Sequence, residues 1–125
     1  MVIQLYVKLP KIREEVKVLG RQLLRSGTSV AAPAREASRG RSGSEFCSKL
    51  DGLLQEADES QLWIELLRDD CGIRTEAADR LHQETGEIMA IFTTMVAKLR
   101  NRTDSFQHFS VSAFSNSSVL AFQFF

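Results

Sequence analysis

Hydrophobic positions recur every three or four residues along most of this chain, which is the spacing of one face of an α-helix. The clearest case is segment 44–70, where such a face is formed by Phe46, Leu50, Leu53, Ala57, Ser60, Ile64 and Leu67. Segment 75–101 carries a second stripe, made of Leu81, Thr85, Ile88, Phe92, Met95 and Leu99. No strand-like alternation separates these stripes, so the pattern predicts an all-α protein.

Boundary residues divide the pattern into four helices. Ser42 and Glu45 form a capping box before the third helix, and Thr75 is a candidate N-cap of the fourth. Gly72 supplies the left-handed residue that ends the third helix. The predicted helices are 2–9, 14–39, 44–70 and 75–101, and short connections between amphipathic helices predict an antiparallel up-and-down four-helix bundle in one domain, 1–102.

The first predicted helix is short or truncated, because Pro10 cannot continue the hydrogen bonds of a helix that precedes it. Pro33 interrupts the second helix in the same way. We expect a bend between Ser29 and Pro33; the alternative is a true break, with Ser29 or Ala32 capping a new start.

The second helix, 14–39, carries two different faces. One face is basic and consists of Arg21, Arg25, Thr28, Ala32, Arg35 and Arg39, with Arg41 following shortly after. The other face starts with leucines and ends with small residues, in the order Leu19, Leu23, Ser26, Val30, Ala34 and Ala37. Because small side chains let helices approach closely, this second face should pack against another helix.

Segment 103–125 departs from the helical pattern. It holds six of the eight phenylalanines and six serines, with one charged residue. We expect a weakly ordered tail; alternatively, its phenylalanines fill a groove on the bundle or on a neighbouring subunit.

Charge is distributed unevenly along the chain, although the net charge is zero. Residues 1–50 contain 10 basic and 4 acidic residues, whereas residues 51–125 contain 6 basic and 12 acidic ones. Such a split can bring helices together within or between subunits, or it can offer one basic face to a polyanion. Both interpretations remain open at this point.

Three glutamates offer partners for the arginines. Glu36, Glu56 and Glu59 lie among apolar neighbours, and we interpret them as a buried polar network in which Glu56 and Glu59 pair with Arg25 or Arg35. A di-metal carboxylate site would need an ExxH motif, which is absent. A further acidic stripe along the third helix could also face the arginines; it contains Asp51, Asp58, Glu65 and Asp69.

No residues indicate catalysis, a metal site or a cofactor. Cys47 and Cys71 are too far apart for a CxxC pair, and His82 and His108 have no ligand or acidic partner at a suitable spacing. No apolar run approaches the roughly 20 residues that span a bilayer. We therefore expect a soluble, cytoplasmic, non-enzymatic protein that carries no metal and does not interact with membranes.

The run LGRQLLRSGTSVAAPAREASRGRS, followed by EF, KL, EADES and LWIELL, resembles the bacterial four-helix bundle family also called 23S rRNA-intervening sequence proteins. The resemblance covers roughly residues 2–100. It implies an up-and-down bundle that assembles into a ring-like homopentamer. Relatives that serve as accessory proteins of diversity-generating retroelements bind nucleic acid and a reverse transcriptase through a basic surface. Pro33 stands where the family usually has asparagine.

Two functions follow as hypotheses. In the first, a homo-oligomeric bundle binds RNA or DNA backbone through Arg21, Arg25, Arg35, Arg39 and Arg41. In the second, the same arginines form salt bridges within or between subunits of a structural or protein-binding module.

Overall fold

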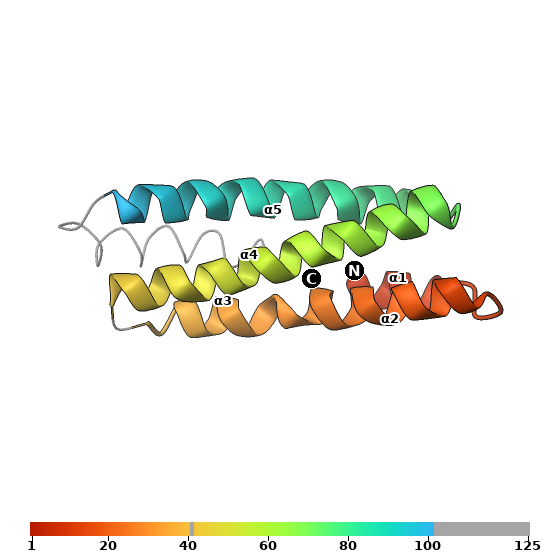
Figure 1. Ribbon diagram of the computed structural model, residues 1–125, viewed down its shortest axis with the longest axis horizontal. Helices are drawn as coiled ribbons and strands as arrows, with labels where there is room; N and C mark the ends of the chain where they lie inside the picture. Colours follow the sequence, from red (N-terminus) through yellow and green to blue (C-terminus); the bar gives the residue numbers. More distant parts are fainter. Residues whose placement is uncertain (41, 102–125) are drawn as a thin grey trace.

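The computed structural model describes residues 1–40 and 42–101, and every regular element in these ranges is helical. The elements are α1 (Val2–Lys8), α2 (Glu14–Ser29), α3 (Ala31–Ala37), α4 (Gly43–Glu65), the π-helix η1 (Leu66–Asp70) and α5 (Glu76–Arg100). Figure 1 shows that α2 and α3 follow one edge of an elongated bundle and that η1 continues α4. The predicted all-α four-helix bundle with a short first helix is confirmed. Arg41 and the predicted tail, 103–125, lie outside the described residues.

The order of the helices around the bundle follows from their contacts. The main contacts of α1 are with α2 and α5, while α4 packs against both α2 and α5. Helices α1 and α4 therefore occupy diagonally opposite corners. Because α1 is short, it accompanies only part of the length of α2, and α3 instead packs on α4.

Two apolar clusters fill the interior. One lies at the α1 end and includes Val2, Leu5, Leu23, Ile64 and Leu81, whereas the other lies at the α3 end. The second cluster contains Val30, Ala34, Ala37, Phe46, Leu50, Leu53, Ala57, Ile88, Phe92 and Leu99. The face of α2 and α3 that was predicted to pack closely against another helix is confirmed: at its midpoint the buried Ser60 hydroxyl of α4 donates to Ser26 Oγ at 2.8 Å.

Local hydrogen bonds fix the helix ends as the sequence predicts. The Ser42 hydroxyl accepts from the Glu45 backbone N–H at 3.2 Å, and the Thr75 hydroxyl accepts from the Ala78 N–H at 3.1 Å. Gly72 has φ +73°, the left-handed conformation expected after the third helix. The sequence did not predict that the last turn before Gly72 would be a π-helix, in which the Cys71 N–H donates to the Leu66 carbonyl.

The interruption between α2 and α3 falls where a bend was predicted. Val30 separates the two helices but keeps helical torsions, φ −65° and ψ −33°. The single predicted helix 14–39 is thus divided into α2 and α3, as the alternative of a break holds. The cap proposed for that break, Ser29 or Ala32, is wrong, because Val30 occupies the N-cap position and no side chain caps α3. Pro33 lies in the first turn of α3, where its missing N–H costs no helical hydrogen bond.

Two glycines let α1 lie close to α2. A Cβ atom at Gly27 would be 2.8 Å from both Cγ atoms of Val2, and one at Gly20 would be 2.8 Å from Leu9 Cδ1. Both distances are shorter than a normal carbon contact, so something must shift if a larger residue stands at either position. At Gly20 the end of the flexible Leu9 side chain can move, whereas at Gly27 the branched Val2 side chain stands in the way.

Candidate nucleic-acid interface

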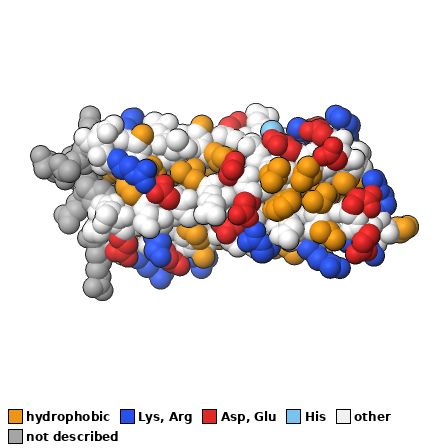
Figure 2. All heavy atoms as spheres, in the orientation of Figure 1, with side chains coloured by type: hydrophobic (Ala, Val, Ile, Leu, Met, Phe, Trp, Pro, Cys, Tyr) orange, Lys and Arg blue, Asp and Glu red, His pale blue; other side chains and the backbone are white. Residues whose placement is uncertain are grey.

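The four described arginines of the predicted basic face lie along the α2–α3 edge of the bundle. Arg21 and Arg25 are on α2, Arg35 is on α3, and Arg39 follows the α3 C-cap; the side chains of all four are exposed. Figure 2 shows basic side chains, with some acidic ones between them, along the edge formed by α2 and α3. We call these four residues the arginine stripe.

The arginine stripe is long enough to follow a nucleic-acid backbone. From Arg21 to Arg39 a helical rise of 1.5 Å per residue gives a length of about 27 Å. Phosphates of one strand follow each other about every 3.4 Å along the axis of a DNA duplex, so this length spans about eight of them. Residues 16–35 contain no aspartate or glutamate, so no carboxylate of α2 or α3 interrupts the stripe between these positions. The Arg21 side chain makes no hydrogen bond or ion pair within the described residues.

Arg25 is held by two carboxylates of α4. Its guanidinium lies 2.5 Å from Glu59 Oε2 and 3.5 Å from Glu56 Oε2, and its Nε donates to Gln22 Oε1 at 3.4 Å. The predicted pairing of Arg25 with Glu56 and Glu59 is therefore correct. Their predicted burial is wrong, because the Glu56 and Glu59 side chains are 25% and 34% exposed and Arg25 is about half exposed. The network lies at the surface, where α2 meets α4.

Glu36 does not join this network. It forms an ion pair with Lys49 of α4 at 2.5 Å, and its side chain is 53% exposed. The hydrogen bond and charge of Glu36 raise the pKa of the Lys49 ammonium above its usual value. The prediction that Glu36 belongs to a buried network with Glu56 and Glu59 is wrong. The antiparallel course of α4 brings Lys49 beside the end of α3, whereas Glu56 lies two turns further along α4.

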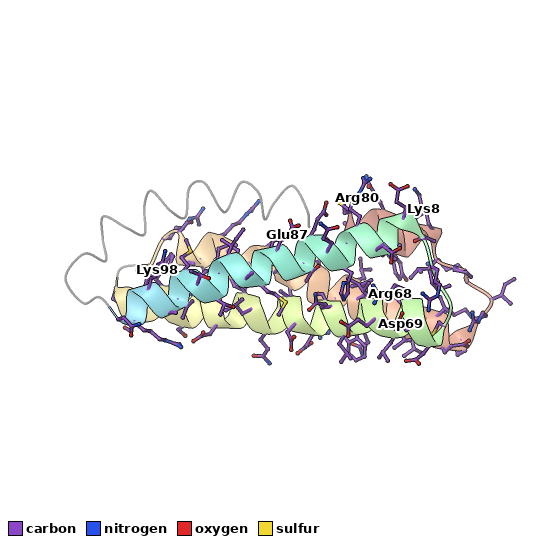
Figure 3. All side chains as sticks on the ribbon, turned by 90° about the horizontal axis from the view of Figure 1, so that it is seen from above. Lys8, Arg68, Asp69, Arg80, Glu87 and Lys98 are labelled. Atoms are coloured by element: carbon purple, nitrogen blue, oxygen red, sulfur yellow. The ribbon has the colours of Figure 1, made fainter. Side chains whose placement is uncertain are left out.

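The acidic stripe of α4 is directed mainly towards α5 and its connection, not towards the arginine stripe. Asp51 pairs with Arg100, and Asp69 pairs with Arg68 at 3.0 Å and Arg74 at 3.7 Å. Figure 3 shows Arg68 beside Asp69. Within the subunit, Arg25 pairs with Glu56 and Glu59 and not with a member of this stripe.

His82 has an acidic partner that the sequence analysis missed. Its Nε2 lies 2.9 Å from Glu65 Oε1, a contact between α5 and α4. Seventeen residues separate the two in sequence, so no local spacing could have indicated the pair.

Both cysteine side chains lie in the interior of the bundle. Cys47 and Cys71 are both buried free thiols, and burial raises the pKa of the Cys47 thiol. Residues 1–40 and 42–101 contain no group of three His, Cys, Asp or Glu side chains that could hold a metal ion. No helix within these ranges has the length and apolar character needed to cross a bilayer.

Comparison with known proteins gives one family. No curated protein and no solved structure matches the chain. The family model described as "23S rRNA-intervening sequence protein" matches residues 1–94, which include the arginine stripe and most of α5. Because this match covers well over half of the 125 residues, the chain belongs to the 23S rRNA-intervening sequence protein family.

Proposed function

We propose that this chain is a non-enzymatic, homo-oligomeric helix-bundle protein that binds the phosphate backbone of RNA or DNA through its arginine stripe. The observation that carries this proposal is the placement of four exposed arginines on one edge, with no acidic residue in 16–35. The family resemblance supports nucleic acid as the polyanion and a homopentamer as the assembly. Two buried free thiols fit a reducing compartment such as the cytoplasm.

The expected contact is with phosphates and not with bases. Arginine guanidinium groups bind phosphate oxygens strongly, and neutralising a phosphate releases condensed counterions, which gives affinity without sequence preference. No aromatic residue lies between Arg21 and Arg39, so no base-stacking platform accompanies the charges. Binding should therefore depend steeply on salt and weakly on sequence.

The members of the stripe should contribute unequally. Arg25 must exchange two carboxylates for a phosphate, and Glu56 and Glu59 would repel a phosphate brought near it. Arg21 has no such competitor among the described residues. The variant Glu59→Gln should consequently raise affinity for a polyanion, whereas Arg21→Ala should lower it.

A second candidate function is a structural or protein-binding module. The observation that favours it is the Arg25–Glu56–Glu59 network, because an arginine bound by two carboxylates already links α2 to α4. In this case the other arginines would pair with carboxylates of a neighbouring subunit or of a protein partner; the family resemblance suggests a reverse transcriptase as such a partner.

The double variant Arg21→Ala/Arg39→Ala separates the two candidates. Fluorescence anisotropy with a labelled structured RNA and a DNA duplex measures binding, and light scattering measures the mass of the assembly. Nucleic-acid binding predicts weaker affinity, a salt slope on the duplex smaller by about 1.8, or 0.9 for each lost contact, and an unchanged mass. Arg80→Ala is the control, because it removes an exposed arginine of α5 outside the stripe.

The contrary result would be no change in polyanion binding together with dissociation of the assembly. That outcome would assign the arginines to contacts between subunits and would support the second candidate.

A further inference from the structure

The two opposite corners of the bundle carry opposite charge. Residues 1–13, which form α1 and the loop after it, contain Lys8, Lys11 and Arg13 and no acidic residue. Residues 51–67 of α4 and η1 contain no lysine or arginine and carry five acidic residues: Asp51, Glu56, Asp58, Glu59 and Glu65. We call these surfaces the basic corner and the acidic corner. Because α1 and α4 lie diagonally across the bundle, they face away from each other.

The basic corner exposes apolar side chains. Helix α1 buries Val2, Leu5 and Leu9 against the bundle, but it leaves Ile3 and Val7, one turn apart, on its outer side. Val7 is 67% exposed. The Lys8 side chain makes no hydrogen bond or ion pair within the described residues, so none of these residues neutralises its charge.

The acidic corner also combines exposed apolar side chains with an unpaired charge, but here the charge is negative. Leu62 is 46% exposed and stands one turn from Asp58, for which the described part of the chain provides no ion-pair partner. Leu66 follows one turn later and is partly exposed. Figure 2 shows apolar side chains gathered over the η1 end of α4 and the adjoining part of α2, with both acidic and basic side chains around them.

We propose that the basic corner of one copy docks against the acidic corner of a second copy. Isoleucine and valine of α1 would cover Leu62 and Leu66, while Lys8 would meet Asp58 or its acidic neighbours. Four of the five acidic side chains already have partners in the subunit, since Asp51 pairs with Arg100, Glu56 and Glu59 with Arg25, and Glu65 with His82. The charge that a second copy would meet is therefore that of Asp58, which Lys8 complements. Both surfaces also expose aliphatic side chains, as the two sides of one interface need. A nucleic acid could not occupy the acidic corner, because its phosphates would be repelled there.

Such a contact is heterologous, because each copy contributes a different surface to it. Every copy then keeps one unused surface of each kind, and the assembly grows until it closes into a ring or continues as a filament. This inference rests on the proposed homo-oligomer and assigns the surfaces that build it.

Two variants, each blocking one corner, test the assignment. Val7→Glu places a negative charge on the basic corner, and Leu62→Lys places a positive charge on the acidic corner; both positions are exposed, so the fold should tolerate the change. Light scattering should find each variant monomeric when it is alone. An equimolar mixture should associate, since Val7→Glu retains the acidic corner and Leu62→Lys retains the basic one.

Ile91→Glu is the matched control, because Ile91 is 43% exposed on α5 and belongs to neither corner. It should keep the mass of the unaltered protein, and circular dichroism should show the same helix content in all three variants. The corner assignment would be overturned if each variant kept the oligomer, or if the mixture stayed monomeric. Either result would leave the proposed homo-oligomer standing. A monomeric unaltered protein at high concentration would overturn the proposed homo-oligomer as well.

Discussion

Replacing Gly27 by alanine should weaken the docking of α1 on α2. The new Cβ would lie 2.8 Å from both Cγ atoms of Val2 and 3.3 Å from its Cβ. Val2 is fully buried and β-branched, so it has little freedom to turn away. Overpacking of this kind costs about 1–3 kcal/mol. Alanine also favours the helix by about 1 kcal/mol over glycine, which leaves a net loss of about 0–2 kcal/mol.

Gly52→Ala is the control that isolates the packing cost. Gly52 lies inside α4, and a Cβ there would meet nothing within 4 Å. This variant should gain about 0.5–1 kcal/mol from helix propensity alone. Chemical denaturation followed by circular dichroism should therefore place Gly27→Ala about 1–3 kcal/mol below Gly52→Ala in free energy of unfolding.

A third variant tests whether Val2 is the obstacle. In a Val2→Ala background the Gly27→Ala change should cost less, because the two nearest methyl groups are gone. Equal stabilisation by Gly27→Ala and Gly52→Ala in the natural background would refute the close packing of α1 that the structure shows.

Two further perturbations test other contacts. Ser60→Ala should lower the free energy of unfolding by about 1 kcal/mol, because it removes the buried hydrogen bond to Ser26; an undiminished unfolding midpoint in urea would contradict that bond. Glu84→Gln should raise the melting temperature at pH 7, since burial raises the pKa of the Glu84 carboxyl above 4.5 and its Oε2 has no hydrogen-bond partner in the described structure. A raised folded-state pKa means that the natural protein loses stability as pH rises from about 4.5 through that pKa. The higher melting temperature of the glutamine variant should therefore disappear below about pH 4.5 in melting curves recorded at several pH values. A difference in melting temperature that stays constant with pH would contradict the raised pKa of Glu84.

Local rules explain why most of the fold could be predicted from the sequence. Ser42, Thr75 and Gly72 end or begin helices through interactions within a few residues, and the structure confirms all three. The periodic apolar positions of 44–70 and 75–101 likewise lie in the core. Such features depend on the chain near each residue and need no knowledge of how the helices pack.

The pairing of charged residues could be predicted only in part. Arg25 was correctly matched with Glu56 and Glu59, but Glu36 pairs with Lys49 and His82 with Glu65. Which residues meet across two helices depends on their relative shift and rotation, and these follow from side-chain packing in the whole bundle. A surface ion pair is also worth at most about 1 kcal/mol, so it does not dictate that packing.

The arginine stripe was located correctly on exposed helix edges, but the sequence could not show which of its members have partners. Arg21 and Arg25 are one turn apart on α2, yet only Arg25 reaches the carboxylates of α4. In the antiparallel pair, the turn of α4 after Glu59, residues 60–63, contains no carboxylate that Arg21 could reach.

The salt dependence of nucleic-acid binding tests the central claim most directly. Affinity of the unaltered protein for a DNA duplex would be measured across a range of salt concentrations. Contact through as many as four arginines predicts that the logarithm of affinity falls linearly with the logarithm of salt, with a slope between about −0.9 and −3.6. Absence of binding at low salt would contradict the claim, and it would mean that the arginines serve contacts with other protein surfaces.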